Sequence, residues 1–330
     1  MKDRVAILGA GSWGTALAIE LSRSGHDVLL WGRDPEVAAR IEAEGRHPRR
    51  LMGYPIPPAT RVTADLGEAF AFGQTLLVAV PCASLRPLIA LSPKGSGAGL
   101  RLVSTGKGIE PETLKRMSEI LLEQYPEAAV AALSGPTFAE GVARGDPTAA
   151  VIASKDAAAV EVLQASMSSP TFRLYRSDDL VGVELAGALK NVVAIAAGIV
   201  SGLGFGPNTL AALVTRGLAE IGRIVRSQGG QDRTVQGLAG IGDLMLTCTG
   251  QQSRNRFVGE QVGMGRKLAD VLIEMPEVAE GARTCLAVPR LANRAAFEAP
   301  IAEAVVQVLY EGVPPREAVE RLMTRALRPE

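Results

Sequence analysis

The sequence predicts a doubly wound α/β domain with a mostly parallel sheet, followed by an all-helical domain. A glycine-rich turn lies between two short apolar runs near the start of the chain. Further apolar runs alternate with helix-like or loop segments up to about residue 178, and helical patterns follow. Such alternation is typical of a parallel sheet covered by helices. Since 330 residues exceed one ordinary domain, we expect two domains, residues 1–180 and 181–330.

The first segment reads as strand, glycine turn, helix and strand. Val5 to Leu8 and Val28 to Trp31 are short apolar runs, and helix-forming residues lie between them. The turn has the pattern G-x-G-x-x-G, made by Gly9, Gly11 and Gly14. In this setting the glycines let a pyrophosphate approach the backbone, and the helix N-terminus offers unpaired N–H groups. The segment therefore predicts a Rossmann-type dinucleotide site.

Four later apolar runs predict the remaining strands of the sheet. They are Leu76 to Val80, Leu100 to Ser104, Ala129 to Leu133 and Ala149 to Ala153. Two of these strands end in glycine-containing loops, one around Lys107 and one around Gly135 and Thr137. Strand carboxyl ends are where such sheets hold ligands, although Lys107 could equally be an isolated loop lysine.

The helical half begins near Asp178 and Asp179, which are favourable residues for a helix start. Its first helix carries Lys190 inside the apolar stretch "ELAGALKNVVAIAAG". A lone helical lysine is commonly a solvated surface residue. However, small residues flank Lys190 at helical spacing and leave room for another group to come close.

Two further polar positions in this half have both a structural and a functional interpretation. Ser253 can cap a helix whose start, with Arg254 and Asn255, would form an anion site, or the helix could be an ordinary surface helix. Asp243, in "GIGDLML", could be a helix cap or a partner for a lysine.

Composition excludes several other classes of protein. Equal numbers of basic and acidic residues, 35 of each, favour neither nucleic acid nor a stable membrane association. The run Val192 to Val200 is too short to span a bilayer, and the start of the chain lacks a signal-peptide pattern. The three cysteines are far apart, so we expect a reducing, cytoplasmic setting and no metal site. His26 and His47 look like a turn residue and a solvated loop residue, which leaves no histidine as proton donor.

Taken together, the motifs make the chain resemble the bacterial NAD(P)-dependent glycerol-3-phosphate dehydrogenases over essentially its whole length. The resemblance rests on "GAGSWGTALA", "KGIE", "SGPTFA", "LKNVVAIAAG", "LVTRGLAE", "GIGDLMLTCTGQQSRNR" and "VAEG". It implies an N-terminal dinucleotide-binding domain and a helical C-terminal domain. The implied reaction interconverts dihydroxyacetone phosphate and sn-glycerol 3-phosphate with NADPH or NADH. Its product, glycerol phosphate, would be used in phospholipid synthesis. A homodimer is one oligomeric state that we consider.

The resemblance also implies roles for individual residues, with Lys190 as the residue that transfers a proton. The implied substrate residues are Lys107, Gly135, Thr137, Lys190, Asp243, Ser253, Arg254 and Asn255. The implied cofactor residues, beside the three glycines of the turn, are Ser12, Trp13, Arg33, Lys107, Ala139, Arg254, Val278 and Glu280. Leu210 departs from the pattern, because relatives commonly carry Lys or Arg there, and this puts one positive charge near the phosphate in doubt.

The chemistry of the residues agrees with these roles. Hydride delivery to a ketone makes a negative oxygen that a donor must neutralise, and without a suitable histidine Lys190 is the natural candidate. Desolvation lowers a lysine pKa whereas a nearby Asp243 raises it, and the sequence leaves open which effect is larger. At the end of the second strand, Arg33 favours NADPH, Asp34 leaves NADH open, and Arg33 could also simply face solvent.

Two rival functions remain at this stage. One is another dehydrogenase with the same two-domain plan, such as a 3-hydroxyacid or 6-phosphogluconate enzyme, which the "SRNR" and "LKNVVAIAAG" segments disfavour. The other is a catalytically silent NADPH-binding sensor. The presence of Lys107, Lys190 and Asp243 argues against a sensor, and turnover would exclude it.

Overall fold

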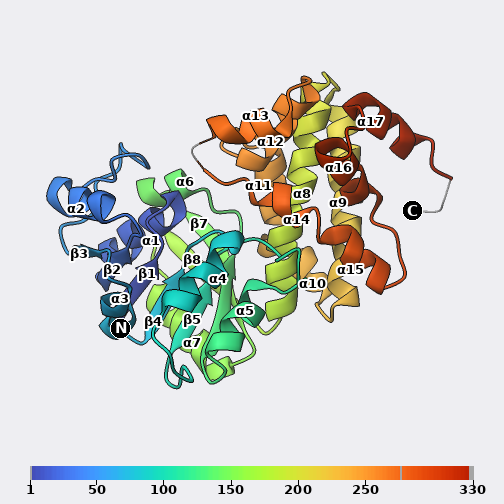
Figure 1. Ribbon diagram of the computed structural model, residues 1–330. Helices are drawn as coiled ribbons and strands as arrows, with labels where there is room; N and C mark the ends of the chain where they lie inside the picture. Colours follow the sequence, from blue (N-terminus) through green and yellow to red (C-terminus); the bar gives the residue numbers. More distant parts are fainter. Residues whose placement is uncertain (1, 276, 327–330) are drawn as a thin grey trace. The chain divides into compact units, whose positions relative to one another are not determined.

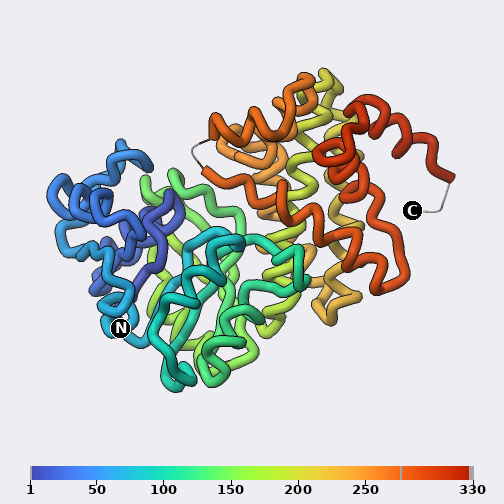
Figure 2. Tube along the Cα trace, viewed as in Figure 1, coloured from blue at the N-terminus to red at the C-terminus, as the bar shows by residue number. Residues whose placement is uncertain are grey.

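The computed structural model describes residues 2–275 and 277–326, which divide into two compact units. Of the described residues, unit 1 comprises 2–106 and 116–183, and unit 2 comprises 107–115, 184–275 and 277–326. The boundary near residue 183 falls inside helix α8 (Leu180–Gly202). Figure 2 shows the Cα trace of the chain, coloured along the sequence.

Unit 1 is built on a sheet of eight strands in the order β3-β2-β1-β4-β5-β6-β7-β8 among the described residues (Figure 1). All neighbouring strands are parallel except β6 and β7, which pair antiparallel. The strands are β1 (Arg4–Leu8), β2 (Asp27–Trp31), β3 (Thr60–Thr63), β4 (Thr75–Val78), β5 (Arg101–Ser104), β6 (Ala129–Ser134), β7 (Thr148–Ser154) and β8 (Phe172–Ser177). The predicted doubly wound, mostly parallel sheet is confirmed.

Helices cover both faces of this sheet because its strands are apolar on both sides. On β1, Val5 and Ile7 enter one core with α1, α6 and α7, whereas Ala6 and Leu8 enter the other with α3, α4 and α5. This is the side-chain alternation of a strand buried on two faces. The helices of this unit are α1 (Ser12–Arg23), α2 (Pro35–Glu44), α3 (Leu66–Phe72), α4 (Cys82–Leu91), α5 (Met117–Gln124), α6 (Ala139–Arg144) and α7 (Ala157–Met167).

The sequence analysis did not predict the two strands at the edges of the sheet. β3 is only four residues long, and only Thr60 is buried in it. In β8, Phe172 and Leu174 are buried while Arg173 and Tyr175 are exposed. Neither edge strand forms a continuous apolar run, since an edge strand needs fewer buried positions than a central one.

The interpretation of His47 as a solvated loop residue is wrong. Only 5% of His47 is exposed, and its Nε2 lies 2.9 Å from the carbonyl oxygen of Ala10. Its Nδ1 accepts hydrogen bonds from the backbone N–H groups of Arg49 and Arg50. Nδ1 is therefore the acceptor and Nε2 the donor, so His47 ties its loop to the glycine turn. His26 does lie at the turn before β2, but it is buried as well.

Unit 2 is helical, as predicted. After α8 it contains α9 (Pro207–Ser227), α10 (Asp232–Val235), a single π-helical turn η1 (Leu238–Gly242), α11 (Asp243–Thr249), α12 (Arg254–Gly263), α13 (Leu268–Glu274), α14 (Glu280–Thr284), α15 (Val288–Arg294), α16 (Pro300–Tyr310) and α17 (Pro315–Met323). The carboxylate of Asp179 accepts a hydrogen bond from the N–H of Gly182, so it caps α8 as the sequence predicted.

Helices α8 and α12 approach each other through glycine on both sides. A Cβ atom on Gly198 would lie 2.0 Å from the carbonyl oxygen of Arg256. A Cβ atom on Gly259 would lie 1.9 Å from the carbonyl oxygen of Ile195. The small residues that follow Lys190 along α8 therefore admit α12, and this contact positions α8 and the start of α12 relative to each other.

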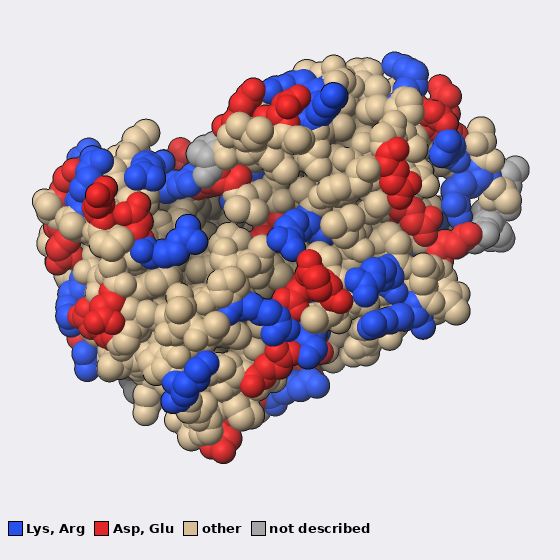
Figure 3. All heavy atoms as spheres, in the orientation of Figure 1, with Lys and Arg blue, Asp and Glu red and all other residues tan. Residues whose placement is uncertain are grey.

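One described helix, α8, is long and apolar enough to span a membrane by length and composition. Its apolar window is entirely buried inside the protein, which is the usual state of a core helix. Charges of both signs are interspersed on the face drawn in Figure 3, so no broad basic patch is visible there. This agrees with the balanced composition of the chain.

Candidate functional site

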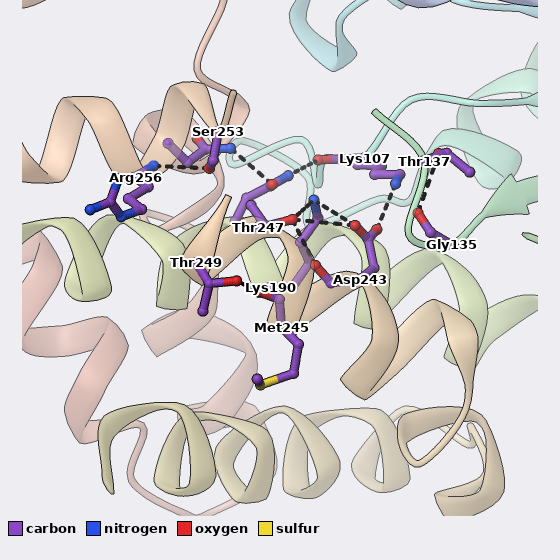
Figure 4. Close-up of polar contacts among 12 residues, drawn as sticks. Lys107, Gly135, Thr137, Lys190, Asp243, Met245, Thr247, Thr249, Ser253 and Arg256 are labelled. Atoms are coloured by element: carbon purple, nitrogen blue, oxygen red, sulfur yellow. Dashed lines mark hydrogen bonds and ion pairs between the residues drawn. The ribbon is translucent and has the colours of Figure 1, made fainter. Parts of the chain in front are cut away.

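Two lysines and one carboxylate form a buried cluster in unit 2 (Figure 4). The Nζ atom of Lys190 on α8 lies 3.0 Å from Oδ1 of Asp243, the first residue of α11. The Nζ atom of Lys107 lies 2.5 Å from Oδ2 of the same carboxylate. The Lys190 and Asp243 side chains are 8% and 2% exposed. Lys190 is therefore a buried ion-paired residue, and its interpretation as a solvated surface lysine is wrong.

Thr247 completes the cluster, one helical turn after Asp243. Its hydroxyl accepts a hydrogen bond from Lys190 Nζ at 2.6 Å and donates one to the carbonyl oxygen of Asp243 at 2.7 Å (Figure 4). The spacing of four residues puts both side chains on the same face of α11. Thr247 and Asp243 therefore hold the Lys190 ammonium from two sides.

The π-helical turn η1 leads directly into α11 and so sets the direction of Asp243. Within this turn, a Cβ atom on Gly240 would lie 2.0 Å from the carbonyl oxygen of Val235, so only glycine fits. Single π-helical turns occur frequently at functional sites. The carboxylate of Asp243 does not cap the helix, since the N-cap residue Gly242 precedes it and both carboxylate oxygens face lysines.

Burial and charge act in opposite directions on these groups. Burial lowers the pKa of Lys190 to about 8, although Asp243 opposes the change by attracting the ammonium. Burial by itself would raise the pKa of Asp243, but attraction by Lys107 and Lys190 outweighs it and holds the pKa below its usual value. Near neutral pH the cluster thus contains an ionised carboxylate and a lysine that can exchange its proton.

Cys248 is next to this cluster along the chain but is not a nucleophile there. Burial raises the pKa of its thiol to about 12. A thiol at this pKa stays protonated near neutral pH, and the thiolate is the reactive form.

The start of α12 has the helix cap and the exposed guanidinium that the sequence analysis considered for an anion site. The hydroxyl of Ser253 caps the helix by accepting a hydrogen bond from the N–H of Arg256 at 3.1 Å. The Arg254 side chain is 48% exposed and lies 3.4 Å from the carboxylate of Glu277. The arrangement presents a guanidinium at a capped helix N-terminus, which suits a phosphate group.

Asn255 is buried, and its side-chain amide bonds to two neighbours. Its Oδ1 accepts a hydrogen bond from the N–H of Gly281, and its Nδ2 donates one to Oδ1 of Asn191. The Nδ2 atom of Asn191 in turn donates to the carbonyl oxygen of Lys107 at 3.0 Å. These contacts connect the start of α12 with the segment that carries Lys107.

In unit 1, the glycine turn between β1 and α1 has the space that a pyrophosphate needs. Gly9 has φ +123°, and a Cβ atom on Gly14 would lie 1.8 Å from the carbonyl oxygen of Gly9. Gly11 is the N-cap of α1, and a Cβ atom there would meet no described atom within 4 Å. Ser12 and Trp13 begin α1. The turn therefore fits a dinucleotide at the N-terminus of α1.

Arg33 and Asp34 follow β2, as predicted, and both are exposed. The Oδ1 atom of Asp34 accepts hydrogen bonds from the N–H groups of Glu36 and Val37, which caps α2. Its Oδ2 lies 3.7 Å from the guanidinium of Arg49. The carboxylate of Asp34 is thus engaged in a helix cap and an ion pair.

The remaining predicted residues lie in loops or at helix starts. In unit 1, Gly135 has φ +152°, the hydroxyl of Thr137 donates to its carbonyl oxygen at 3.3 Å, and Ala139 begins α6. In unit 2, Val278 is exposed and Glu280 begins α14. Leu210 lies in the first turn of α9.

The structure thus brings Lys107, Lys190 and Asp243 into one cluster, and Ser253, Arg254 and Asn255 to one helix start. The sequence analysis missed Thr247 and Asn191. The spacing of Thr247 four residues after Asp243 could have placed it on the same face, and Asn191 directly follows Lys190. Their hydrogen-bond partners come from distant segments, which a sequence pattern does not show. Among the described residues no group of three or more His, Cys, Asp or Glu side chains could hold a metal ion.

Comparisons with known proteins give a consistent result. Residues 4–160 match the family model for the NAD-dependent glycerol-3-phosphate dehydrogenase N-terminus, and residues 179–320 match that for the C-terminus. The chain is 45% identical over 329 residues to glycerol-3-phosphate dehydrogenase [NAD(P)+] of Pelodictyon phaeoclathratiforme, with 99% of each chain covered. It is 48% identical over 334 residues to the protein of the same name from Geobacter sulfurreducens, covering 100% of this chain and 99% of that one. The crystal structure of glycerol-3-phosphate dehydrogenase from Coxiella burnetii superposes with a TM-score of 0.92 at 38% identity, covering 98% of this chain and 99% of the other.

Proposed function

The chain belongs to the NAD-dependent glycerol-3-phosphate dehydrogenase family, and on that premise we propose that Lys190 transfers the proton in its reaction. The protein interconverts dihydroxyacetone phosphate and sn-glycerol 3-phosphate with NAD(P)H. In the direction of reduction, hydride reaches the C2 carbonyl carbon and a proton reaches the carbonyl oxygen. The cofactor supplies the hydride, and the protein must supply the proton and hold the substrate.

The ammonium of Lys190 is suited to this proton transfer. Its contacts with Asp243 and Thr247 use two of the three N–H donors. The third can donate to the substrate carbonyl oxygen and stabilise the negative charge that develops there. With a pKa of about 8, Lys190 can give up its proton in reduction and take one up in oxidation near neutral pH.

The single observation that carries this proposal is the Lys107–Asp243–Lys190 cluster. One buried carboxylate shared by two lysines holds both side chains in fixed positions. Asp243 keeps Lys190 charged despite its burial, because it attracts the ammonium. Thr247 joins the set as a positioning residue, since its hydroxyl bonds to Lys190 and to the backbone of Asp243.

We assign the substrate phosphate to the start of α12. Arg254 would pair with the phosphate, and the N–H groups of the first turn would add hydrogen bonds. Glu277 now lies 3.4 Å from the Arg254 guanidinium, so the phosphate would compete with it. We also propose Gly135 and Thr137 of unit 1 as substrate contacts.

We assign the cofactor pyrophosphate to Gly9, Gly11 and Gly14, with Ser12 and Trp13 at the start of α1. The tight backbone of this turn and the open space at Gly11 support the assignment. Further proposed cofactor contacts are Lys107, Ala139, Arg254, Val278 and Glu280.

The relatives are named as using NAD(P)+, which covers both cofactors. We propose that Arg33 favours NADPH, because a guanidinium can pair with the 2′-phosphate. Asp34 would accept hydrogen bonds from the ribose of NADH, but its carboxylate already caps α2 and pairs with Arg49. We therefore expect Arg33→Ala to weaken NADPH binding about ten- to a hundredfold, through one lost set of charged hydrogen bonds, and to change NADH binding little. Fluorescence titration of both cofactors measures this, and an unchanged NADPH-to-NADH preference would remove Arg33 from the site.

The experiment that tests the function follows the loss of NADPH absorbance with three alternative substrates. They are dihydroxyacetone phosphate, unphosphorylated dihydroxyacetone, and the oxo acid of an oxo acid/hydroxyacid pair. Dihydroxyacetone phosphate should turn over best. Arg254→Leu should raise its KM by roughly ten- to a hundredfold, because a charge-assisted hydrogen bond is worth about 1.5 to 3 kcal/mol. Any reaction of dihydroxyacetone should be much less affected. Turnover of only the hydroxyacid pair would overturn the proposed substrate.

The wider role follows from the family and not from the geometry. We propose that the enzyme acts in the cytoplasm and supplies sn-glycerol 3-phosphate to phospholipid synthesis. A homodimer is the oligomeric state we propose to test, by light scattering.

A further inference from the structure

Three hydrogen bonds in series connect the segment of Gly281 to the segment of Lys107. The backbone N–H of Gly281 donates to Oδ1 of Asn255 at 2.9 Å. Nδ2 of Asn255 donates to Oδ1 of Asn191 at 2.9 Å, and Nδ2 of Asn191 donates to the carbonyl oxygen of Lys107 at 3.0 Å. We call these four residues the amide relay.

The direction of the amide relay is fixed by its two ends. Gly281 contributes a backbone N–H, which can only donate, and Lys107 contributes a carbonyl oxygen, which can only accept. If either asparagine amide were turned around, two donors or two acceptors would face each other. Both side-chain orientations are therefore determined by the hydrogen bonds themselves.

The amide relay is also buried and tightly packed. Asn191 is 4% exposed and Asn255 is 8% exposed, so an amide that lost its partner would be a buried unpaired polar group. A Cβ atom on Gly281 would lie 2.6 Å from the carbonyl oxygen of Asn191 and 2.8 Å from Oδ1 of Asn255. Gly281 therefore has no room for a side chain, and its backbone lies close to both asparagines.

The two ends of the amide relay have different proposed roles. One end adjoins residues proposed to contact the cofactor alone, and the other end is Lys107, which is proposed to contact the substrate as well as the cofactor. Glu280 directly precedes Gly281, Val278 lies three residues before it, and both are proposed cofactor contacts. The side chain of Lys107 lies 2.5 Å from Asp243 in the proposed catalytic cluster. The amide relay joins these two positions through protein atoms alone.

We propose that the amide relay couples cofactor binding to substrate binding, with Asn191 and Asn255 as positioning residues that act through the backbone of Lys107. The inference rests on the proposed function. When the cofactor contacts Val278 and Glu280, the relay holds the backbone of Lys107 in the position that suits the substrate. By linkage, bound substrate strengthens cofactor binding by the same factor. This role is distinct from direct contact between Asn255 and the substrate.

The test measures the coupling factor directly, as the ratio of the dissociation constants of sn-glycerol 3-phosphate without and with saturating NADPH. This pair cannot react because both partners are in their reduced forms, so calorimetry reports binding alone. We expect sn-glycerol 3-phosphate to bind about tenfold more tightly to the NADPH complex of the wild type, within the usual range of coupling between sites.

Asn191→Asp and Asn255→Asp each break one link while keeping the size of the side chain. In Asn191→Asp, a carboxylate oxygen would face the carbonyl oxygen of Lys107, and in Asn255→Asp it would face Oδ1 of Asn191. Each variant should lower the coupling factor to about threefold or less. Because the relay is a single series, the double variant should lose no more coupling than either single variant.

Two controls separate coupling from charge and from folding. Gln252→Glu adds the same charge beside the start of α12 at an exposed residue outside the relay, and it should keep the tenfold factor. Asn191→Ser removes the amide without adding charge, and its coupling factor should equal that of Asn191→Asp. If the buried carboxylates prevent the Asp variants from folding, Asn191→Ser provides the test.

The outcomes are separable. A wild type that binds neither NADPH nor sn-glycerol 3-phosphate would contradict the proposed function itself. A wild type that binds both with a coupling factor near one would overturn the relay and leave the proposed function intact. The relay would also be overturned if the folded asparagine variants kept the tenfold coupling factor. The same holds if the double variant lost more coupling than either single variant.

Discussion

Lys190 shows how one residue can be both buried and charged. Burial lowers its pKa to about 8, and Asp243 keeps the pKa from falling further. In the direction of reduction the enzyme needs the protonated lysine, so the rate should fall as the pH rises above about 8. In the direction of oxidation the neutral lysine is needed, and the rate should rise over the same range.

Asp243→Asn tests this balance. The substitution keeps the size of the side chain but removes the charge that raises the lysine pKa, so the pKa of Lys190 should fall below 8. The break in the pH profile of kcat for reduction should therefore move to lower pH. A profile measured from pH 6 to 10 gives the answer, and an unshifted break would show that Asp243 does not control the proton on Lys190.

At this scale the sequence predicted the residue types of the cluster but not their geometry. The small residues around Lys190 and the lack of a suitable histidine indicated Lys190, and the motif around Asp243 indicated a partner. The sequence could not show whether burial or attraction dominates the lysine pKa, because that depends on distances between α8, α11 and the segment of Lys107. The same dependence on packing hid Thr247 and Asn191.

At the level of elements, strands in the middle of the sheet were predicted because both of their faces are buried. In β1 and β4 every residue after the first is apolar and buried, whereas β3 and β8 at the sheet edges mix polar and apolar residues. The antiparallel pairing of β7 is likewise not visible in an apolar run. The glycine contact between α8 and α12 depends on two distant segments meeting, so spacing alone could not reveal it.

The contact between α8 and α12 predicts that a larger residue at Gly259 destabilises the protein. Gly259→Ala would place a methyl group 1.9 Å from the carbonyl oxygen of Ile195, so the helices must separate. We expect a loss of roughly 1 to 3 kcal/mol in the free energy of unfolding and a higher KM for the phosphorylated substrate, because the start of α12 moves away from α8.

Gly222→Ala is the matched control for that substitution. Gly222 lies inside α9, and a methyl group there would meet its nearest neighbours at 3.7 and 3.9 Å, which is ordinary contact. We expect it to stabilise the protein by roughly 0.5 to 1 kcal/mol through helix propensity. Urea unfolding of both variants checks the pair, and equal losses of stability would contradict the close helix contact.

At the scale of the whole molecule, Glu220 makes stability depend on pH. Its carboxylate lies on α9, is 4% exposed, and accepts hydrogen bonds at 3.0 Å from the N–H groups of Ile301 and Ala302 at the start of α16. Burial raises its pKa to about 7, although these two N–H groups oppose the change. Between pH 4.5 and about 7 the folded protein therefore binds a proton that the unfolded chain has lost.

The free energy of unfolding should fall as the pH rises through that range, by roughly 3 kcal/mol from this group. Glu220→Gln cannot titrate, so its stability relative to the wild type should increase by about that amount between pH 4.5 and 7.5. Urea unfolding at several pH values measures the difference. A constant difference between the two proteins would show that Glu220 has an ordinary pKa.

The account as a whole depends on Lys190, and Lys190→Met tests it most directly. Methionine keeps the length and apolar character of the side chain but cannot donate a proton, while the cofactor residues of unit 1 are unchanged. We predict that the rate of dihydroxyacetone phosphate reduction, followed by loss of NADPH absorbance, falls by roughly 10² to 10⁴-fold with NADPH affinity nearly intact. Near-normal turnover by Lys190→Met would contradict its role as the proton donor.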